Sequence, residues 1–182
     1  VSESTISNTH RVAPSLEGKD NARSNEILQQ NDDVRPPQLF AALMETGVAK
    51  LLFSCGHWDL SIKVTDLEGK MIQSVNKQMD IVTCVAVASD YGQHWLVSGS
   101  KDCTIVIWNI SPEDKETILS PRCVLYGHDG AICSVCINSE LDTIVSGSED
   151  GIILVHSLRG EIYIRCLDVK NGNIRNNTVW SP

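Results

Sequence analysis

Three polar side chains, His128, Ser146 and Asp150, have types and a spacing that could support chemistry. A histidine and a carboxylate can act as a catalytic pair or as two ligands of a metal. The same residues can instead form a structural hydrogen-bonded chain, because an imidazole and a hydroxyl both donate and accept, whereas a carboxylate only accepts. Ser146 lies between His128 and Asp150 in the sequence and could link them, so we interpret the three residues as a structural network. We therefore expect no catalytic residue and no metal site here.

The cysteines are predicted to pack rather than to bind metal or form disulfides. Their number, seven, is odd, and most lie in apolar runs, where a thiol behaves as a small buried hydrophobe. A secreted disulfide framework more often has an even count, so the pattern indicates a reducing, cytosolic compartment. Only Cys133 and Cys136 have C-x-x-C spacing. Their segment is rich in β-branched residues, and residues i and i+3 of a strand project to opposite faces, so one metal between them is not expected.

No motif of an enzyme accompanies these residues. Ser98 and Ser146 lie in Ser-Gly-Ser, which lacks the Gly-x-Ser-x-Gly frame of a hydrolase nucleophile. The sequence has no P-loop, no dinucleotide-binding fingerprint after a strand and no His-Glu-x-x-His. We expect no enzymatic activity and no cofactor. His156 is interpreted as a core or rim histidine, and Trp58 and Trp95 as packing residues.

The composition argues against several classes of partner. The chain has 182 residues, with 15 Lys and Arg against 23 Asp and Glu, a net charge of −8 and no basic cluster. A nucleic-acid partner is therefore not expected, nor attraction to an anionic membrane by charge alone. The longest apolar stretch, 81–88, is far shorter than the roughly 20 residues that span a bilayer. The first residue is Val1, which favours a piece of a longer protein.

Short strands are predicted to position these side chains. Residues 1–37 are polar, end in Pro36-Pro37 and have no sustained period, which predicts a linker or a disordered segment. From 38 to 168 about ten short apolar runs alternate with turn residues, which predicts an all-β region. Residues 169–182 are interpreted as the start of a next segment or a disordered tail.

A repeat runs through this β region. The sequence Ser-Gly-Ser-x-Asp at 98–102 recurs 48 residues later at 146–150, and a weaker copy 43 residues earlier keeps Gly56 and Asp59. A period in the forties with several strands per unit is typical of β-propeller blades. Three units predict about three blades. Because a closed ring typically has four to eight, we expect part of a larger propeller.

The repeats resemble the WD-repeat family, in which a Gly-His pair precedes the turn aspartate, as Gly127-His128 precedes Asp150. The resemblance implies a hydrogen-bonded chain in each blade, formed by that histidine, a Ser or Thr on the second strand, the turn Asp and a Trp on the third strand. The implied members are His128, Ser146, Asp150 and His156 (in place of Trp) in the last repeat, Ser98, Asp102 and Trp108 with Asp80 in place of His in the middle repeat, and Asp59 with Cys55 and Thr65 in the first. His57 of Gly56-His57 is assigned to a turn, not to the Gly-His position.

Segments 51–59, 79–84 and 139–150 are similar to the WD-repeat region of BEACH-domain proteins, above all the neurobeachin and neurobeachin-like group. The resemblance covers about 38–168. It implies a non-catalytic protein-interaction module of a large cytoplasmic scaffold that supports membrane and vesicle trafficking. The expected partners are other proteins, with intracellular membranes contacted only through parts of the parent that this sequence lacks. Two alternatives stay open: a WD-repeat adaptor for signalling or ubiquitin-ligase substrate recruitment, and a propeller hydrolase.

Overall fold

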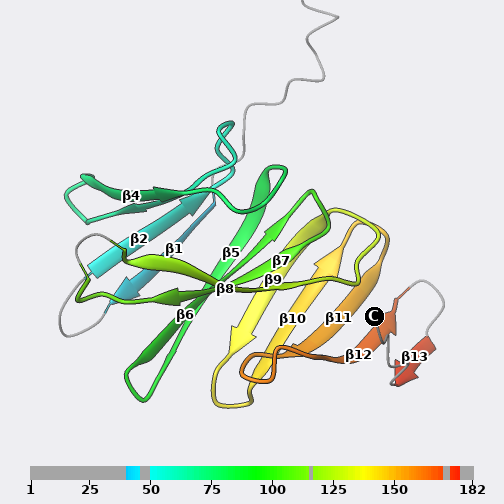
Figure 1. Cartoon of the computed structure of the whole chain (residues 1–182). Coiled ribbons are helices and arrows are strands. Elements are labelled where there is room, and N and C mark those ends of the chain that lie inside the picture. Colours follow the sequence, from blue (N-terminus) through cyan, green and yellow to red (C-terminus); the bar gives the residue numbers. More distant parts are fainter. Residues whose placement is uncertain (1–39, 46–49, 115–116, 170–172, 177–182) are drawn as a thin grey trace, which may run out of the picture. The chain divides into compact units, whose positions relative to one another are not determined.

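The computed structural model describes residues 40–45, 50–114, 117–169 and 173–176. The segment 1–37, expected to be a linker or disordered, lies outside these described residues. The described elements are all β-strands, which confirms the all-β expectation, and they form three antiparallel sheets (Figure 1). Within the same described residues, no helix has the length and apolar character needed to cross a membrane.

Consecutive strands of the chain are neighbours in each sheet. The first sheet consists of β1 (Phe40–Glu45), β2 (Lys50–Cys55), β3 (Ile62–Thr65) and β4 (Met71–Val75). The second consists of β5 (Val82–Asp90), β6 (Gln93–Ser100), β7 (Ile105–Ile110) and β8 (Leu119–Leu125). The third consists of β9 (Ile132–Asn138), β10 (Thr143–Ser148), β11 (Ile152–Ser157), β12 (Tyr163–Asp168) and β13 (Asn173–Asn176). Strand β13 pairs with β12, so the third sheet extends beyond Asp168, the expected end of the repeat region.

The first strands of the three sheets lie next to one another. Strand β5 contacts β1 and β2 on one side and β9 on the other, and Figure 1 shows the sheets following one another in sequence order. Sheets that pack face to face around a row of first strands are the blades of a β-propeller. We call the three sheets blades 1, 2 and 3; together they form an open part of a ring.

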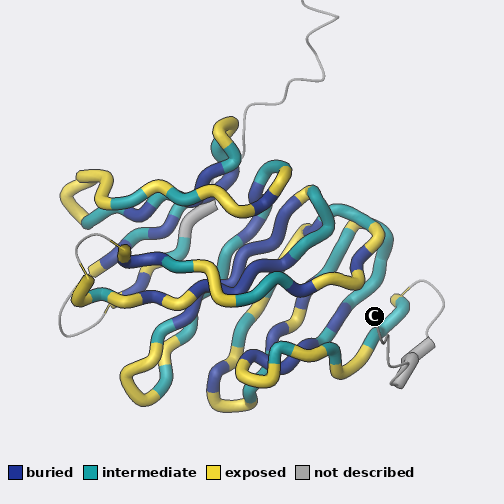
Figure 2. Tube along the Cα trace, in the orientation of Figure 1, coloured by how far each residue is buried: buried dark blue, intermediate teal, exposed yellow. Residues whose placement is uncertain are grey.

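Blade 2 is covered on both faces. In β7 every residue except Asn109 is buried, and in β6 every residue from Trp95 to Ser100 is buried (Figure 2). A strand with one wet face alternates apolar and polar residues, whereas a strand buried on both faces carries a continuous apolar run. The run Ile105–Trp108 therefore reflects the position of blade 2 between two neighbours.

Two apolar clusters join the blades. Between blades 1 and 2 the buried members include Phe53, Ile62, Val64, Leu96, Trp108 and Leu119. Between blades 2 and 3 they include Trp95, Val97, Ile105, Ile107, Ile132, Ile144 and Leu158. Polar bonds cross the same interfaces: the Gln73 side chain donates to the Leu119 carbonyl (3.0 Å) and accepts from its N–H (2.7 Å). Thr83 Oγ1 donates to the Ile132 carbonyl at 2.5 Å.

The far face of blade 3 is not covered by any described residue. Strand pairing places Phe53, Val97 and Val145 at equivalent positions, since their partners across the hairpin are Val64, Ile107 and Val155. Phe53 and Val97 are 0% exposed beneath the next blade, whereas Val145 is 37% exposed. The face of blade 3 that carries Val145 is therefore equivalent to the faces that blades 1 and 2 bury against the blade that follows them.

Two equivalent glycines, Gly99 and Gly147, show the same difference between a covered and an uncovered face. A Cβ added at Gly99 would lie 2.4 Å from Cγ2 of Ile132 and 2.9 Å from Sγ of Cys84. A Cβ added at Gly147 would meet nothing within 4 Å. The glycine of Ser-Gly-Ser in blade 2 is therefore required by the close approach of blade 3, and not by its backbone conformation.

Candidate functional site

Each blade has an aspartate turn between its second and third strands. One carboxylate oxygen accepts the backbone N–H of the residue two positions later. The pairs are Asp59 with Ser61 (3.1 Å), Asp102 with Thr104 (2.9 Å) and Asp150 with Ile152 (2.8 Å). The residue directly after each aspartate has a left-handed backbone: Leu60 (φ 60°), Cys103 (φ 68°) and Gly151 (φ 83°). The three aspartates thus have the same local surroundings, and each fixes the end of a hairpin.

Blade 2 contains a continuous chain of hydrogen-bonded residues that begins in its buried interior and ends at its partly exposed turn. Trp108 Nε1 donates to Ser98 Oγ (2.9 Å), and Ser98 Oγ donates to Gln78 Oε1 (2.8 Å). Gln78 Nε2 donates to the Thr104 carbonyl (3.0 Å), and Thr104 Oγ1 donates to Asp102 Oδ1 (2.6 Å). Trp108 and Ser98 are at most 1% exposed. Every polar side chain of this chain has a partner, as buried polar groups require.

The residue at the histidine position of blade 2 is Gln78, so the expectation that Asp80 stands there is wrong. Gln78 and His128 each lie four residues before the first strand of their blade, β5 or β9. A carboxamide, like an imidazole, offers both a donor and an acceptor, and can therefore occupy the same place in the network. The Asp80 carboxylate instead accepts the N–H of Ile81 (2.6 Å), outside the network.

In blade 3 the corresponding residues form two separate groups. His128 Nε2 lies 2.8 Å from Ser146 Oγ, which also approaches the Leu154 carbonyl (3.5 Å). Asp150 instead accepts the hydroxyl of Ser148. His156, at the Trp108 position, does not reach Ser146. Neither of its ring nitrogens has a hydrogen-bond partner among the described residues, although the ring is 1% exposed.

Blade 1 departs most from the expected pattern. Ser54 pairs with Lys63 as Ser98 pairs with Val106, so Ser54, and not Cys55, occupies the serine position. Ser98 and Ser146 lie four residues before their turn aspartates, and the same spacing from Asp59 points to Cys55. The turn of blade 1 is one residue longer, which places Ser54 there instead. Ser54 Oγ contacts Nε2 of His57 at 3.0 Å, and His57 lies in this turn, as expected. The loop before β1, where a counterpart of Gln78 would stand, lies outside the described residues.

The family model described as the neurobeachin beta propeller domain matches residues 21–181. The chain belongs to the neurobeachin β-propeller family.

Relatives of this neurobeachin-type propeller are large proteins. The chain is 35% identical over 154 residues to BEACH domain-containing protein B of Arabidopsis thaliana, covering 75% of this chain and 6% of that protein. It is 35% identical over 129 residues to a putative neurobeachin homolog of Caenorhabditis elegans, covering 64% of this chain and 5% of that protein. It is 32% identical over 128 residues to BEACH domain-containing protein lvsE of Dictyostelium discoideum, covering 69% and 6%. The chain therefore spans only about one-twentieth of these relatives.

A solved structure supports the fold. The WD40 β-propeller domain of Doa1 superposes with a TM-score of 0.52 at 18% sequence identity, covering 68% of this chain and 38% of that one. The fold is thus an open part of a WD40 propeller, as the repeats predict.

The other candidate residues of this neurobeachin-type propeller differ in how far they are exposed to solvent. Trp95 is 2% exposed and packs between blades 2 and 3, as expected, whereas Trp58 is 58% exposed, so the packing interpretation of Trp58 is wrong. Cys133 and Cys136, also expected to pack, are exposed. Cys136 alternates with core residues of β9 and lies on the uncovered face of blade 3. Among the described residues, no group of three or more potential metal ligands is assembled.

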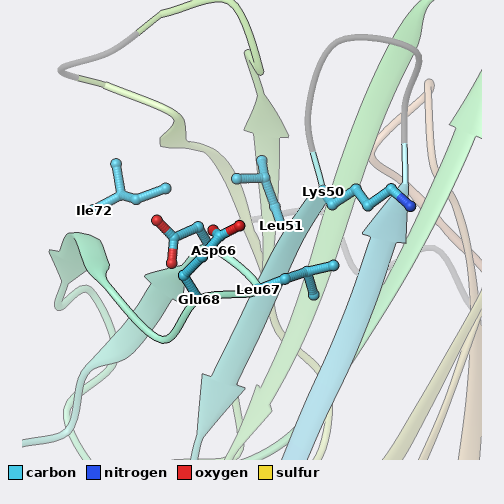
Figure 3. A pocket seen from close by; sticks show the side chains of 6 residues that line it. All are labelled: Lys50, Leu51, Asp66, Leu67, Glu68 and Ile72. Atoms are coloured by element: carbon cyan, nitrogen blue, oxygen red, sulfur yellow. The ribbon is translucent and has the colours of Figure 1, made fainter.

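A shallow pocket of about 340 Å³ lies on blade 1. It is lined by Lys50, Leu51, Asp66, Leu67, Glu68 and Ile72 (Figure 3). The Lys50 side chain points away from the two carboxylates in this view, and its ammonium pairs with Glu45 at 2.7 Å. Asp66 Oδ1 accepts the N–H of Lys70 (2.7 Å). Lys50 and Asp66 are thus each engaged in a local contact, and the Lys50 ammonium does not point towards the carboxylates of the pocket.

The turn carboxylates are held in their ionised form. A hydrogen bond from the Ser61 hydroxyl is the main cause that lowers the pKa of Asp59 to about 2. Burial would raise the pKa of Asp102 and Asp150, but hydrogen bonds, chiefly from Thr104 and from Ser148, outweigh it and place both below the ordinary value. These turns therefore keep their hydrogen bonds at neutral pH. Their contribution to stability is complete above the unfolded-state pKa of about 4 and is lost as the pH falls through the folded-state pKa, which for Asp59 is about 2.

Replacing Asp150 by alanine is expected to lower the free energy of unfolding by about 1–3 kcal/mol, because the N–H of Ile152 and the hydroxyl of Ser148 lose their acceptor. The matched control is Glu149→Ala, which removes the adjacent, exposed carboxylate and should change stability by less than about 0.5 kcal/mol. Urea unfolding followed by tryptophan fluorescence measures both. Equal effects of the two substitutions would contradict a structural role of the Asp150 turn.

Acid is expected to destabilise blade 3 through its buried histidines. Burial, and secondly the charge of His128, lower the pKa of His156 to about 4, although the nearby backbone of Tyr126 opposes the shift. Burial also lowers the pKa of His128. The unfolded chain, with histidine pKa values of about 6.5, then binds more protons than the folded one, so stability falls as pH drops from 6.5 towards 4. We expect His156 alone to account for about 2 kcal/mol between pH 7 and pH 5.

The measurement is urea unfolding at a series of pH values, comparing the unaltered chain with His156→Phe. The phenylalanine variant should retain a smaller pH dependence, due to His128. A dependence as steep as that of the unaltered chain would contradict the assignment to His156.

Proposed function

We propose that this chain is a non-catalytic protein-interaction module within a large BEACH-type scaffold that supports membrane and vesicle trafficking. The observation that carries the proposal is the match to the neurobeachin β-propeller over residues 21–181. Propellers present the turns of their blades at two rims, which offer protein partners several rigid surfaces. Large apolar side chains stand exposed at such turns here, for example Trp58 (58%) and Tyr91 (100%).

The absence of catalysis is part of the proposal, and burial supports it. Ser146 is 1% exposed and His128 is 7% exposed, so a substrate would not reach the serine hydroxyl that the hydrolase alternative needs. Their hydrogen bond to each other belongs to the interior of blade 3. The polar residues that suggest chemistry in the sequence are, in this proposal, residues that stabilise turns.

We further propose a cytoplasmic location, with contact to intracellular membranes through other parts of the parent protein. The net charge of −8 supports membrane contact through other parts of the parent, because anionic lipid surfaces repel a negative chain. Partners of this region are then proteins, recruited by the scaffold to a membrane at which another domain holds it.

The test compares affinity purifications from cytosol of the full-length parent protein and of a parent lacking residues 38–168. We expect the deletion to lose a discrete set of partner proteins while membrane association persists. Loss of membrane association with an unchanged partner set would contradict the interaction role. Recovery of ubiquitin-ligase or signalling components as the only lost proteins would favour the adaptor alternative. A hydrolytic activity abolished by His128→Ala would favour the hydrolase.

A further inference from the structure

A single arginine joins three turns at the rim opposite the aspartate turns. The turns connect β5 with β6, β9 with β10 and β11 with β12. Arg159 Nη2 donates to Asp90 Oδ2 (2.5 Å) of the first turn, and Arg159 Nη1 donates to the Ser139 carbonyl (2.8 Å) of the second. Its own N–H donates to Asp142 Oδ1 (2.7 Å). Its guanidinium lies 5.3 Å from the centre of the Trp95 ring, which anchors it to the core.

Further bonds make this assembly rigid. Ser139 Oγ donates to the Ser89 carbonyl (3.2 Å), and Arg122 Nε donates to Glu161 Oε1 (2.5 Å). The contacts link blades 2 and 3 at several points, so the three turns are held in fixed relation. A surface held in this way loses little conformational entropy when a partner binds. We call the three turns together the Arg159 rim.

Each turn of the Arg159 rim presents one large apolar side chain to solvent. These are Tyr91 (100% exposed), Leu141 (73%) and Ile162 (62%), and Figure 2 shows the exposed tips of the three turns at the lower edge of the view. Exposed apolar residues are ordinary when they stand singly. Here all three flank residues of one hydrogen-bonded assembly, which sets them apart from scattered surface residues.

Tyr91 occupies a backbone conformation that does not suit it. The turn between β5 and β6 has two central residues with positive φ, Tyr91 (45°) and Gly92 (77°). Such turns favour Asn or Asp at the first position and Gly at the second, and a bulky residue there is strained. The side chain is fully exposed, so it contributes no packing that would offset this strain. Backbone strain of this kind is concentrated at functional sites.

The charges of the rim identify the kind of partner. The turns carry four carboxylates, Asp90, Glu140, Asp142 and Glu161, against one guanidinium group, that of Arg159, and the guanidinium of Arg122 in β8 reaches Glu161 of the same rim. Arg159 pairs with Asp90 and Asp142, and Arg122 pairs with Glu161, which leaves an excess of negative charge with Glu140 beside Leu141. Basic groups are therefore attracted and acidic groups repelled.

We propose that the Arg159 rim is a docking surface for a partner protein segment that carries apolar side chains flanked by lysines or arginines. This proposal rests on the interaction role proposed above and names the surface and the chemistry of its partner. Tyr91, Leu141 and Ile162 supply apolar contacts, and the excess carboxylate selects basic segments over acidic ones.

The experiment uses the full chain and a fluorescent synthetic peptide with leucines at helical three- and four-residue spacing and lysines elsewhere. The comparison peptide has glutamates in place of the lysines. We expect fluorescence anisotropy to show binding of the lysine peptide at least about tenfold tighter than that of the glutamate peptide. Tyr91→Asn and Leu141→Ser should each weaken binding severalfold. Trp58→Ala, on the opposite rim, is the matched control and should leave binding unchanged.

Tyr91→Asn also separates function from folding. Because asparagine suits the first position of this turn, the variant should raise the melting temperature while it weakens peptide binding. A lower melting temperature would overturn the assignment of Tyr91 to docking, as would equal binding of the two peptides. Binding to vesicles of phosphatidylcholine and phosphatidylserine that Tyr91→Asn abolishes would overturn it in favour of a membrane.

The same variants in the full-length parent distinguish this proposal from the broader one. Loss of particular proteins on deletion of residues 38–168, but no change with Tyr91→Asn or Leu141→Ser, would overturn the Arg159 rim and leave the interaction role in place. Retention of every partner in the deletion would overturn both.

Discussion

Replacing Gly99 by alanine is expected to lower the free energy of unfolding by about 3 kcal/mol, at the upper end of the cost of overpacking a core. The new Cβ would lie 2.4 Å from Cγ2 of Ile132, a β-branched side chain that is itself 0% exposed. Ile132 cannot rotate away, because it packs between blades 2 and 3. The substitution therefore forces the two blades apart, and urea unfolding measures the loss.

The chain contains its own control for this substitution. Gly147 occupies the same position in blade 3 but has open space where a Cβ would stand. Gly147→Ala should be neutral or should stabilise the chain by up to about 1 kcal/mol, because alanine restricts the unfolded state. A second check is Ile132→Ala in the Gly99→Ala background, which should recover part of the lost packing. Similar losses for the two glycine substitutions would contradict the packing of blade 3 on blade 2.

Removal of the Trp108 side chain is expected to have the largest effect of any single substitution, about 3–5 kcal/mol. The indole is 1% exposed in the cluster between blades 1 and 2, so its loss leaves a large cavity. The change also removes the donor to Ser98 Oγ, the first bond in the buried chain that leads to Asp102. Thermal and urea unfolding of Trp108→Ala should both show the loss.

Two further tryptophan variants separate the causes. Trp58→Ala removes a side chain that is 58% exposed and should change stability by less than about 0.5 kcal/mol. Trp108→Phe keeps most of the apolar volume but removes the N–H, and should cost less than the alanine variant. If Trp108→Ala behaved like Trp58→Ala, the structural role of this network in blade 2 would be refuted.

The aspartate turns could be found from sequence because their chemistry is local. An aspartate that accepts an N–H two residues later depends only on its own hairpin, so the repeated Asp59, Asp102 and Asp150 point directly to three similar turns. The same locality made the all-β region predictable, since short apolar runs and turn residues record strand ends.

The partners of these turns were harder to place, because they depend on register. One additional residue in the turn of blade 1 moves the serine position from Cys55 to Ser54. In blade 2 a glutamine replaces the family's histidine, and only its distance from β5, the first strand of the blade, identifies Gln78. The 22-residue spacing from His128 to Asp150, applied to Asp102, leads to Asp80, whereas the four-residue distance to the first strand of the blade leads to Gln78.

The contacts between blades could not be predicted at all. Arg159 contacts Asp90, which is 69 positions away, and Ser139, which is 20 positions away. No local sequence pattern predicts contacts between residues so far apart in the chain. The exposure of Cys136 has the same origin, since it depends on which face of blade 3 a neighbouring blade covers. Burial in repeated sheets is decided by neighbours, and not by the repeat itself.

The uncovered face of blade 3 has a consequence for motion. Backbone amides exchange with solvent when a region opens locally, and opening is easiest where few apolar contacts must be broken. Strands β6 and β7 have blades on both sides, whereas the hairpin of β10 and β11 has only one. Amide protons should therefore exchange most slowly in β6 and β7 and faster in β10 and β11, giving a gradient of local stability through blades that share the Ser-Gly-Ser-x-Asp repeat.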